Sequence, residues 1–135
     1  MMKPITGRLL ALAATNGLIA TMLAALGNHA LKTSLSEQAL AWFNMGAIMQ
    51  MATTIALLGA ALLGEHGRKG WANKSAAASG LGILFFSGSL YMLALSEPNG
   101  IGGFHWLTPL GGGLLMLGWW LLAIGAFRSS RGFRG

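Results

Sequence analysis

The sequence predicts an all-α fold, an integral membrane bundle of four transmembrane helices, formed by a single domain over residues 1–135. Three observations lead to this prediction. The chain contains four long apolar stretches without a charged side chain, at residues 9–30, 38–63, 76–96 and 108–127. Only 9% of its residues are charged, whereas a soluble domain has about 25%. The basic residues lie between the apolar stretches, as they do in membrane proteins.

Each stretch is long enough to form a membrane-spanning helix. A helix needs about 20 apolar residues to cross the hydrocarbon core, and in lipid its backbone satisfies its own hydrogen bonds. The first stretch follows Lys3 and Arg8 and so imitates a secretory signal peptide. It is longer than the apolar segment of about 7–15 residues that such peptides have. We therefore expect it to be retained as the first span.

The flanking residues predict where the later helices begin and end. Ser34-Leu35-Ser36-Glu37 has the spacing of a capping box before the second stretch. Pro98-Asn99-Gly100 ends the third stretch, because these residues continue a helix poorly. For the fourth stretch, Thr108 is the expected N-cap and Pro109 the first helical residue.

The distribution of Lys and Arg predicts that both termini are cytoplasmic. With the N-terminus inside, eight of the nine basic residues fall in cytoplasmic segments, and only Lys32 falls outside. Such a bias follows the positive-inside rule. The eight residues are Lys3, Arg8, Arg68, Lys69, Lys74, Arg128, Arg131 and Arg134.

The absence of charge from the spans argues against several classes of function. Ion-coupled transporters and proton relays usually hold an ionisable side chain within the membrane. The chain has no cysteine, which removes thiolate metal sites and cysteine nucleophiles. Ser87 and Ser89 have no histidine or charged partner in the spans to activate them, so we expect no enzyme. The basic residues are dispersed rather than gathered with aromatic residues on one face, so we expect no nucleic-acid partner.

The three histidines are too scattered to form one metal site. His66 falls on the opposite side of the membrane from His29 and His105, and two ligands alone make a poor closed site. We therefore expect no metal and no cofactor. A membrane enzyme or metal protein centred on His29 remains an alternative.

Uncharged polar residues in the spans suggest a polar interior made of Asn16, His29, Gln50 and Thr53. Amides and hydroxyls of this kind commonly form hydrogen bonds between transmembrane helices, which is the interpretation that we favour. The alternative is a polar path for a solute.

The sequence FFSGSLYMLALS, residues 85–96, predicts a surface on which helices dock. Helices in lipid associate through small residues that let their backbones approach closely. A tyrosine can keep its ring in apolar surroundings while its hydroxyl reaches a partner. The expected packing residues are Gly82, Ser87, Gly88, Ser89 and Tyr91 in the third stretch, with Gly112 and Gly118 in the fourth.

These residues also carry a family resemblance. The sequence FSGSLYMLALS followed by TPLGGGLLMLGWWLLAIGA resembles the signature of the YgdD-like family of small bacterial inner-membrane proteins of uncharacterised function. LSEQALAWFNMG and LGNHALK, with His29 at the family's histidine, resemble two further elements of it. The family tends to have Tyr-Gln-x-x-His in the second span, where this chain has Met49 to Thr53, so that histidine is replaced. The resemblance implies a four-span inner-membrane protein and supplies no activity.

The expected function is that of a non-catalytic multi-pass protein of the bacterial inner membrane. We expect an accessory or scaffolding subunit whose partners are membrane lipids and other transmembrane helices, in a hetero-complex or a homo-oligomer. The alternative is a small channel or facilitator with a neutral polar lumen lined by Asn16, Gln50 and Thr53.

Overall fold

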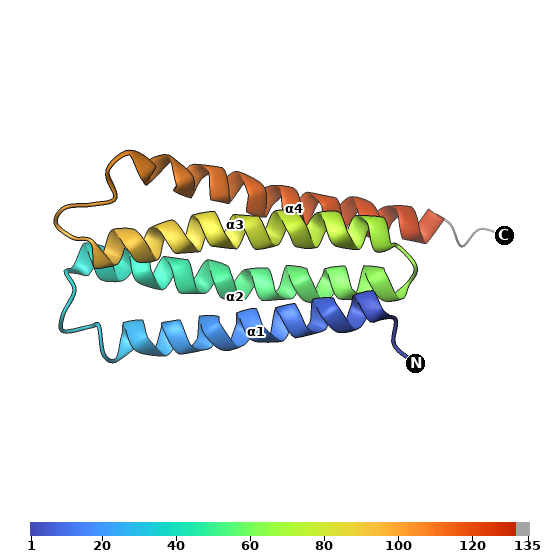
Figure 1. Cartoon of the computed structure of the whole chain (residues 1–135), viewed down its shortest axis with the longest axis horizontal. Coiled ribbons are helices and arrows are strands. Elements are labelled where there is room, and N and C mark those ends of the chain that lie inside the picture. Colours follow the sequence, from blue (N-terminus) through green and yellow to red (C-terminus); the bar gives the residue numbers. More distant parts are fainter. Residues whose placement is uncertain (132–135) are drawn as a thin grey trace.

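The computed structural model describes residues 1–131, and its main elements are four long helices (Figure 1). They are α1 (Pro4–Asn28), α2 (Glu37–Glu65), α3 (Lys69–Leu95) and α4 (Leu107–Arg131), with a short 3-10 helix, η1 (Gly102–Trp106), before α4. All four long helices are apolar enough to cross a membrane, and no strand occurs in residues 1–131. The predicted all-α fold with four spans is thereby confirmed.

The helices lie side by side in chain order, as Figure 1 shows. The most extensive contacts join α1 to α2, α2 to α3 and α3 to α4, while α2 also touches α4. Half of the most apolar part of α2 is buried within the protein, compared with 22% for α1 and for α4. The inner helices α2 and α3 therefore form the centre of the molecule, and the two outer helices expose most of their surface.

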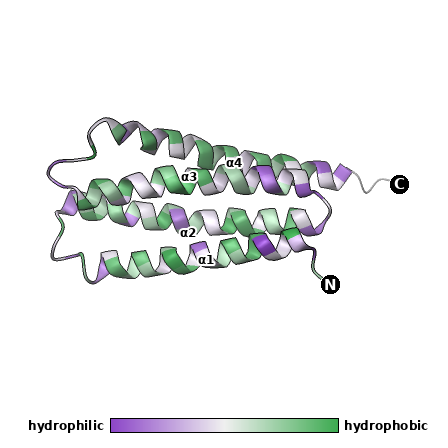
Figure 2. Ribbon diagram, in the orientation of Figure 1, coloured by the Kyte–Doolittle hydropathy of each residue, from purple (hydrophilic) through white to green (hydrophobic). Residues whose placement is uncertain are grey.

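Small residues dominate the contacts between helices. Ala13, Ala60 and Ala72 are fully buried in one cluster, and Ala39 and Ala94 in another at the opposite end of the molecule. Many large apolar side chains instead point outward, as for example Met116, whose exposed fraction is 71%. Figure 2 shows hydrophobic residues along all four helices, with hydrophilic residues gathered mainly toward the ends. This distribution suits a protein surrounded by lipid, where close backbone approach drives packing.

Two of the predicted helix starts need correction. The N-cap of α2 is Ser36 rather than Ser34, because the Ser36 hydroxyl accepts a hydrogen bond of 3.1 Å from the backbone N–H of Ala39. Helix α4 begins at Leu107, one residue before the expected cap Thr108. The 3-10 helix η1 runs directly into α4, and the backbone N–H of Leu107, the first residue of α4, donates to Phe104 O in η1.

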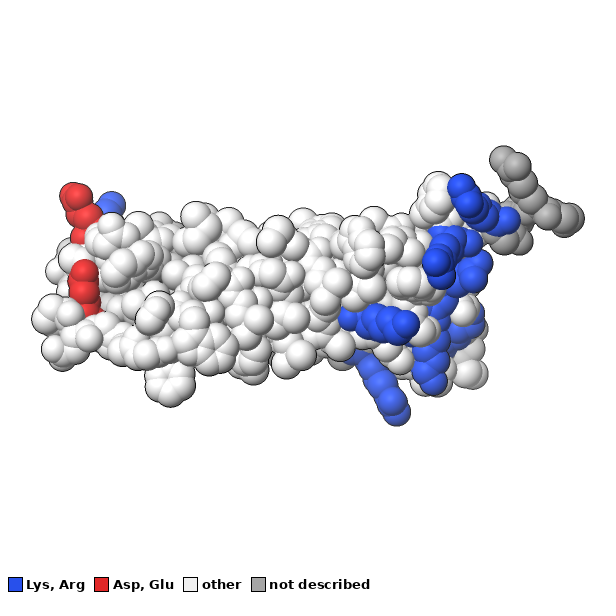
Figure 3. All heavy atoms as spheres, turned by 90° about the horizontal axis from the view of Figure 1, so that it is seen from above, with Lys and Arg blue, Asp and Glu red and all other residues white. Residues whose placement is uncertain are grey.

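The charged residues are divided between the two ends of the molecule. Figure 3 shows Lys and Arg gathered at the end where Figure 1 places both termini. We call this the basic end. Arg134 lies outside the described residues. The charge distribution agrees with the pattern on which the topology prediction rests, while the membrane side that each end faces stays a prediction.

Candidate functional site

A chain of hydrogen bonds crosses the three helices α1, α2 and α3. The Gln50 amide donates to Asn16 Oδ1 at 3.1 Å, and the Tyr91 hydroxyl donates to Gln50 Oε1 at 2.8 Å. Asn16 Nδ2 donates back to the backbone oxygen of Gln50 and to the Thr54 hydroxyl, both at 2.9 Å. Asn16 and Gln50 are buried, with exposed fractions of 9% and 6%. We call Asn16, Gln50 and Tyr91 the polar chain.

Local packing places the Tyr91 hydroxyl at Gln50. The ring lies against Gly46 of α2, where an added Cβ would be 2.8 Å from the ring carbon Cε1. Phe43, also on α2, packs against the same ring, with the ring centroids 4.9 Å apart and the planes tilted by 52°. Gly46 is therefore required for the close approach of Tyr91 to α2. The sequence analysis did not identify Gly46 as a packing residue, and it did not predict that Gln50 and Tyr91 form a hydrogen bond.

The other expected members of the polar interior form none of the hydrogen bonds of the polar chain within residues 1–131. Thr53 is buried, but its hydroxyl donates to the backbone oxygen of Met49 in its own helix at 2.7 Å. His29 is exposed and directly follows the last residue of α1. Its backbone N–H donates a hydrogen bond to the backbone oxygen of Ala25. The structure therefore joins Asn16 to Gln50 by hydrogen bonds, whereas the Thr53 hydroxyl bonds within its own helix and His29 lies at the end of α1.

Serine hydroxyls and glycines line the contact between α3 and its two neighbours. Ser87 donates to the backbone oxygen of Gly46 in α2 at 2.8 Å. Ser89 lies 2.6 Å from the Thr108 hydroxyl of α4. An added Cβ at Gly82 would lie 2.8 Å from the Leu115 backbone nitrogen, and one at Gly118 would strike the Ser79 hydroxyl. The four residues, all of them expected packing residues, therefore lie where α3 packs against α2 or α4.

Two of the expected packing glycines are not at such contacts. An added Cβ at Gly88 would meet nothing within 4 Å, so Gly88 does not dock α3 onto a neighbour within this chain. Gly82 and Gly88 are six residues apart, which places them about 120° apart around a helix with 3.6 residues per turn.

In α4 the glycine in close contact is Gly111, whose added Cβ would lie 2.8 Å from the backbone carbon of Phe85. The expected packing residue Gly112 makes only ordinary contacts with the Phe86 ring. Gly111, Gly118 and Gly125 are spaced seven residues apart in the sequence, and this spacing could have identified the packing face of α4.

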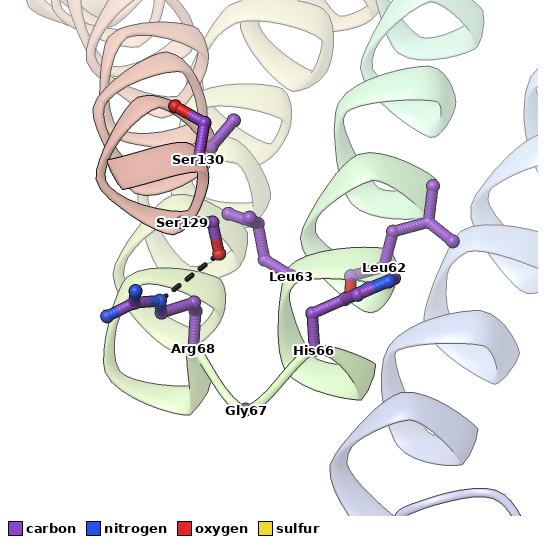
Figure 4. Close-up of a pocket in the computed structure, with 8 residues that line it drawn as sticks. Leu62, Leu63, His66, Gly67, Arg68, Ser129 and Ser130 are labelled. Atoms are coloured by element: carbon purple, nitrogen blue, oxygen red, sulfur yellow. Dashed lines mark hydrogen bonds between the residues drawn. The ribbon is translucent and has the colours of Figure 1, made fainter. Parts of the chain in front are cut away.

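A groove of about 680 Å³ opens at the basic end, between the C-terminal ends of α2 and α4 (Figure 4). The loop that forms its rim is shaped by Gly67, whose φ of +82° ends α2. The backbone N–H of Arg68 donates to Leu63 O at 2.9 Å and that of Gly67 to Gly64 O at 3.2 Å, which are the two bonds of a Schellman motif. This motif directs Arg68 toward α4.

Arg68 fixes the loop to the end of α4. Its Nε donates to the Ser129 hydroxyl at 3.1 Å, as Figure 4 shows, and its Nη2 donates to the backbone oxygen of Arg128 at 3.0 Å. Arg128 and Lys74 also approach the ring of Trp71, at 5.0 and 5.2 Å from its centroid. Sequence reasoning used Arg68 only for charge counting, and its contact with α4 spans 61 residues.

The one carboxylate at the basic end, among the described residues, is engaged by α1. Glu65 lies just beyond the apolar stretch of residues 38–63, and its Oε2 accepts a hydrogen bond of 2.6 Å from the Thr6 hydroxyl. The backbone N–H of Lys3 also donates to this oxygen, at 3.1 Å. Both hydrogen bonds favour the ionised carboxylate and hold the pKa of Glu65 below its usual value. Within residues 1–131, no cluster of three or more metal-ligating side chains occurs.

Comparisons with known proteins give the family. Residues 23–112 match the profile of the family described as "Protein of unknown function (DUF423)". The chain is 42% identical over 120 residues to a UPF0382 membrane protein of Haemophilus influenzae, an alignment that covers 89% of this chain and 94% of that protein. It is 35% identical to the UPF0382 inner membrane protein YgdD of Escherichia coli K12, covering 91% and 92% of the two chains.

A more distant relative occurs in another bacterial group. The chain is 34% identical to a UPF0382 membrane protein of Staphylococcus saprophyticus, with coverage of 87% of this chain and 94% of that protein. No solved structure matches the chain. The resemblance noted in the third and fourth stretches is thereby confirmed: the chain is a membrane protein that belongs to the DUF423 family of proteins of unknown function.

Proposed function

We propose that this protein is a non-catalytic accessory or scaffolding subunit of the bacterial inner membrane, with both termini in the cytoplasm. The observation that supports this role most directly is the polar chain. Asn16, Gln50 and Tyr91 bond to one another and to the backbone, so their polar atoms are used in holding helices together. Uncharged polar groups with this arrangement stabilise helix association in lipid.

The outer surface supplies the second argument for a partner. Helix α3 turns Gly80, Leu84 and Gly88 outward, and an added Cβ at either glycine would meet nothing within 4 Å. Beside Gly80 and Leu84 lies an open depression of about 160 Å³ that Leu12 and Asn16 also line. A helix of another membrane protein can approach closely at such a face because small residues bring backbones together. We call Gly80, Leu84 and Gly88 the open face of α3.

The alternative is a small channel or facilitator with a neutral lumen. Such a protein would need Asn16, Gln50 and Thr53 to line one water-filled path. The depression that Asn16 lines includes neither Gln50 nor Thr53. The geometry of this single chain therefore favours the accessory role over the channel.

Co-purification from native membranes in mild detergent tests the proposal. A specific membrane protein should co-purify with the parent chain and be lost with Gly88→Leu, which adds bulk to the open face of α3. Gly113→Leu is the matched control, because Gly113 also has no neighbour within 4 Å but lies on α4. Retention of the same partner by both variants would contradict the use of this face.

A flux assay in liposomes separates the two functions. We expect the purified protein to leave the permeability of the liposomes to water and small neutral solutes unchanged. An increase in solute flux that Gln50→Leu abolishes would support the channel and overturn the accessory role.

A further inference from the structure

We propose that the groove between the C-terminal ends of α2 and α4 binds an anionic phospholipid. The proposal goes beyond the accessory role, since a lipid site requires no protein partner. It rests on three features of the groove in the described part of the chain: the order of its apolar and polar residues, the donors of Arg68 that no described residue binds, and the absence of a carboxylate from the described lining.

The lining residues change from apolar to polar along the helix axes. Leu62, Leu63 and Ala126 contribute the part of the groove that lies nearer the centre of the spans. About one turn further toward the basic end, the lining is polar, with Arg68 from the loop and Ser129 from α4 beside His66, Gly67 and Ser130. Figure 4 shows this rim, with Arg68 and Ser129 joined across it. An acyl chain fits the apolar part, and a phosphate fits the rim.

The rim offers hydrogen-bond donors to a phosphate. Arg68 uses Nε and one N–H of Nη2 in its bonds to α4, whereas a guanidinium has five N–H donors. The remaining donors have no protein partner among the described residues. Ser129 accepts from Arg68, so its hydroxyl proton is also available to donate. Guanidinium groups bind phosphate oxygens strongly because the hydrogen bonds are assisted by charge.

Charge complementarity identifies the occupant. Among residues 1–131, the groove lining contains Arg68 and no carboxylate, and Glu65 is engaged by Thr6 and Lys3. Arg128 and Lys74 add positive charge around Trp71 on the neighbouring surface. Basic pockets between transmembrane helices near a membrane surface bind anionic headgroups. A zwitterionic lipid would bind more weakly, because the positive charge of its own ammonium group is repelled by the basic residues around the groove.

Native mass spectrometry of the delipidated protein in detergent tests the proposal. The protein is titrated with phosphatidylglycerol and, separately, with phosphatidylcholine that has the same acyl chains. We expect tighter binding of phosphatidylglycerol by the parent chain. Arg68→Gln should weaken that binding about fivefold, the contribution expected of one basic residue at an anionic membrane surface.

Lys69→Gln is the matched control for charge, because Lys69 is exposed at the same end but does not line the groove. It should weaken phosphatidylglycerol binding by less than about twofold, since its charge acts only through the general surface potential. Equal losses for the two variants would overturn the site, as would equal affinity of the parent chain for the two lipids. Displacement of phosphatidylglycerol by millimolar inorganic phosphate would assign the rim to free phosphate and overturn the lipid assignment.

A second variant keeps the proposal testable if Arg68→Gln does not fold. Ala126→Trp fills the apolar part of the groove without changing charge and should weaken phosphatidylglycerol binding. Met116→Trp, at a position on α4 that is 71% exposed and outside the groove, should leave it unchanged. Unchanged binding in Ala126→Trp would overturn the proposal.

Discussion

The hydroxyl of Tyr91 shows how one polar atom joins two helices in lipid. It donates to Gln50, while its ring occupies the space that Gly46 leaves on α2. The Gln50 side chain is held in turn by Asn16. Each member therefore orients the next, and loss of Gln50 removes the acceptor of Tyr91 and one partner of Asn16.

Tyr91→Phe is expected to destabilise the folded protein by about 1 kcal/mol, the usual value of a hydrogen bond between transmembrane helices. Because the hydroxyl has Gln50 as its acceptor, the same substitution should cost close to nothing in a Gln50→Leu background. SDS-induced unfolding of the two single variants and the double variant measures the coupling. Thr21→Ala is the control, since the Thr21 hydroxyl bonds within its own helix. Additive costs would contradict the polar chain.

At the scale of the element, α3 presents one face of small residues to α4. Ser75, Ser79, Gly82 and Ser89 are buried on it, at spacings of three, four and seven residues. Ser75 donates to the Gly118 backbone oxygen at 2.9 Å. This spacing matches the seven-residue repeat with which long helices pack along one another. The remaining faces of α3 pack on α2 or turn outward.

Gly82→Leu is expected to destabilise the protein by about 1–3 kcal/mol, the usual cost of overpacking. Its new side chain would begin 2.8 Å from the Leu115 backbone nitrogen, which cannot move without shifting α4. Gly88→Leu, in the same helix, should be neutral or slightly stabilising, because nothing lies within 4 Å and Leu forms helices better than Gly. Thermal unfolding in detergent compares the two. If Gly88→Leu proved the more harmful of the pair, the assignment of faces on α3 would be wrong.

Gly67→Ala tests the loop that joins α2 to α3. At φ of +82° a Cβ is strained, and the left-handed conformation costs an L-residue about 1–2 kcal/mol. We expect a loss of stability of that order, measured by the same unfolding assay. Gly70→Ala is the control: Gly70 lies inside α3, with no neighbour within 4 Å and no positive φ. Equal effects in the two variants would show that the Schellman motif contributes nothing.

For the whole molecule, the distribution of charge predicts the topology. Reporter fusions after Gly70 and after Arg134 are expected to read cytoplasmic, because the adjoining loops and the C-terminal segment hold most of the Lys and Arg. A fusion after Asn99 is expected to read periplasmic, since the segment of residues 97–107 contains no basic side chain apart from His105. A periplasmic signal at the C-terminus would contradict the model of four spans with both termini in the cytoplasm.

The sequence by itself determined the four spans and the family. Hydropathy is summed over about 20 residues of a segment, so a span can be predicted without knowing any contact that its residues make. The predicted stretches 38–63 and 108–127 lie inside the helices Glu37–Glu65 and Leu107–Arg131. The sequence also predicted that the third and fourth stretches pack through small residues. Its seven-residue spacing would have selected Gly111 over Gly112.

Only the tertiary structure decided which face of each helix is inside. In a soluble protein the polar face of a helix marks the surface, but here both faces are apolar, and exposed Leu84 resembles buried Leu90 in sequence. That is why the sequence did not show that Gly88 faces away from the other helices of this chain. The bonds of Gln50 to Tyr91 and of Arg68 to Ser129 join residues that are 41 and 61 positions apart. Such pairs depend on how helices are placed in space, because no local pattern of residues encodes the distance between them.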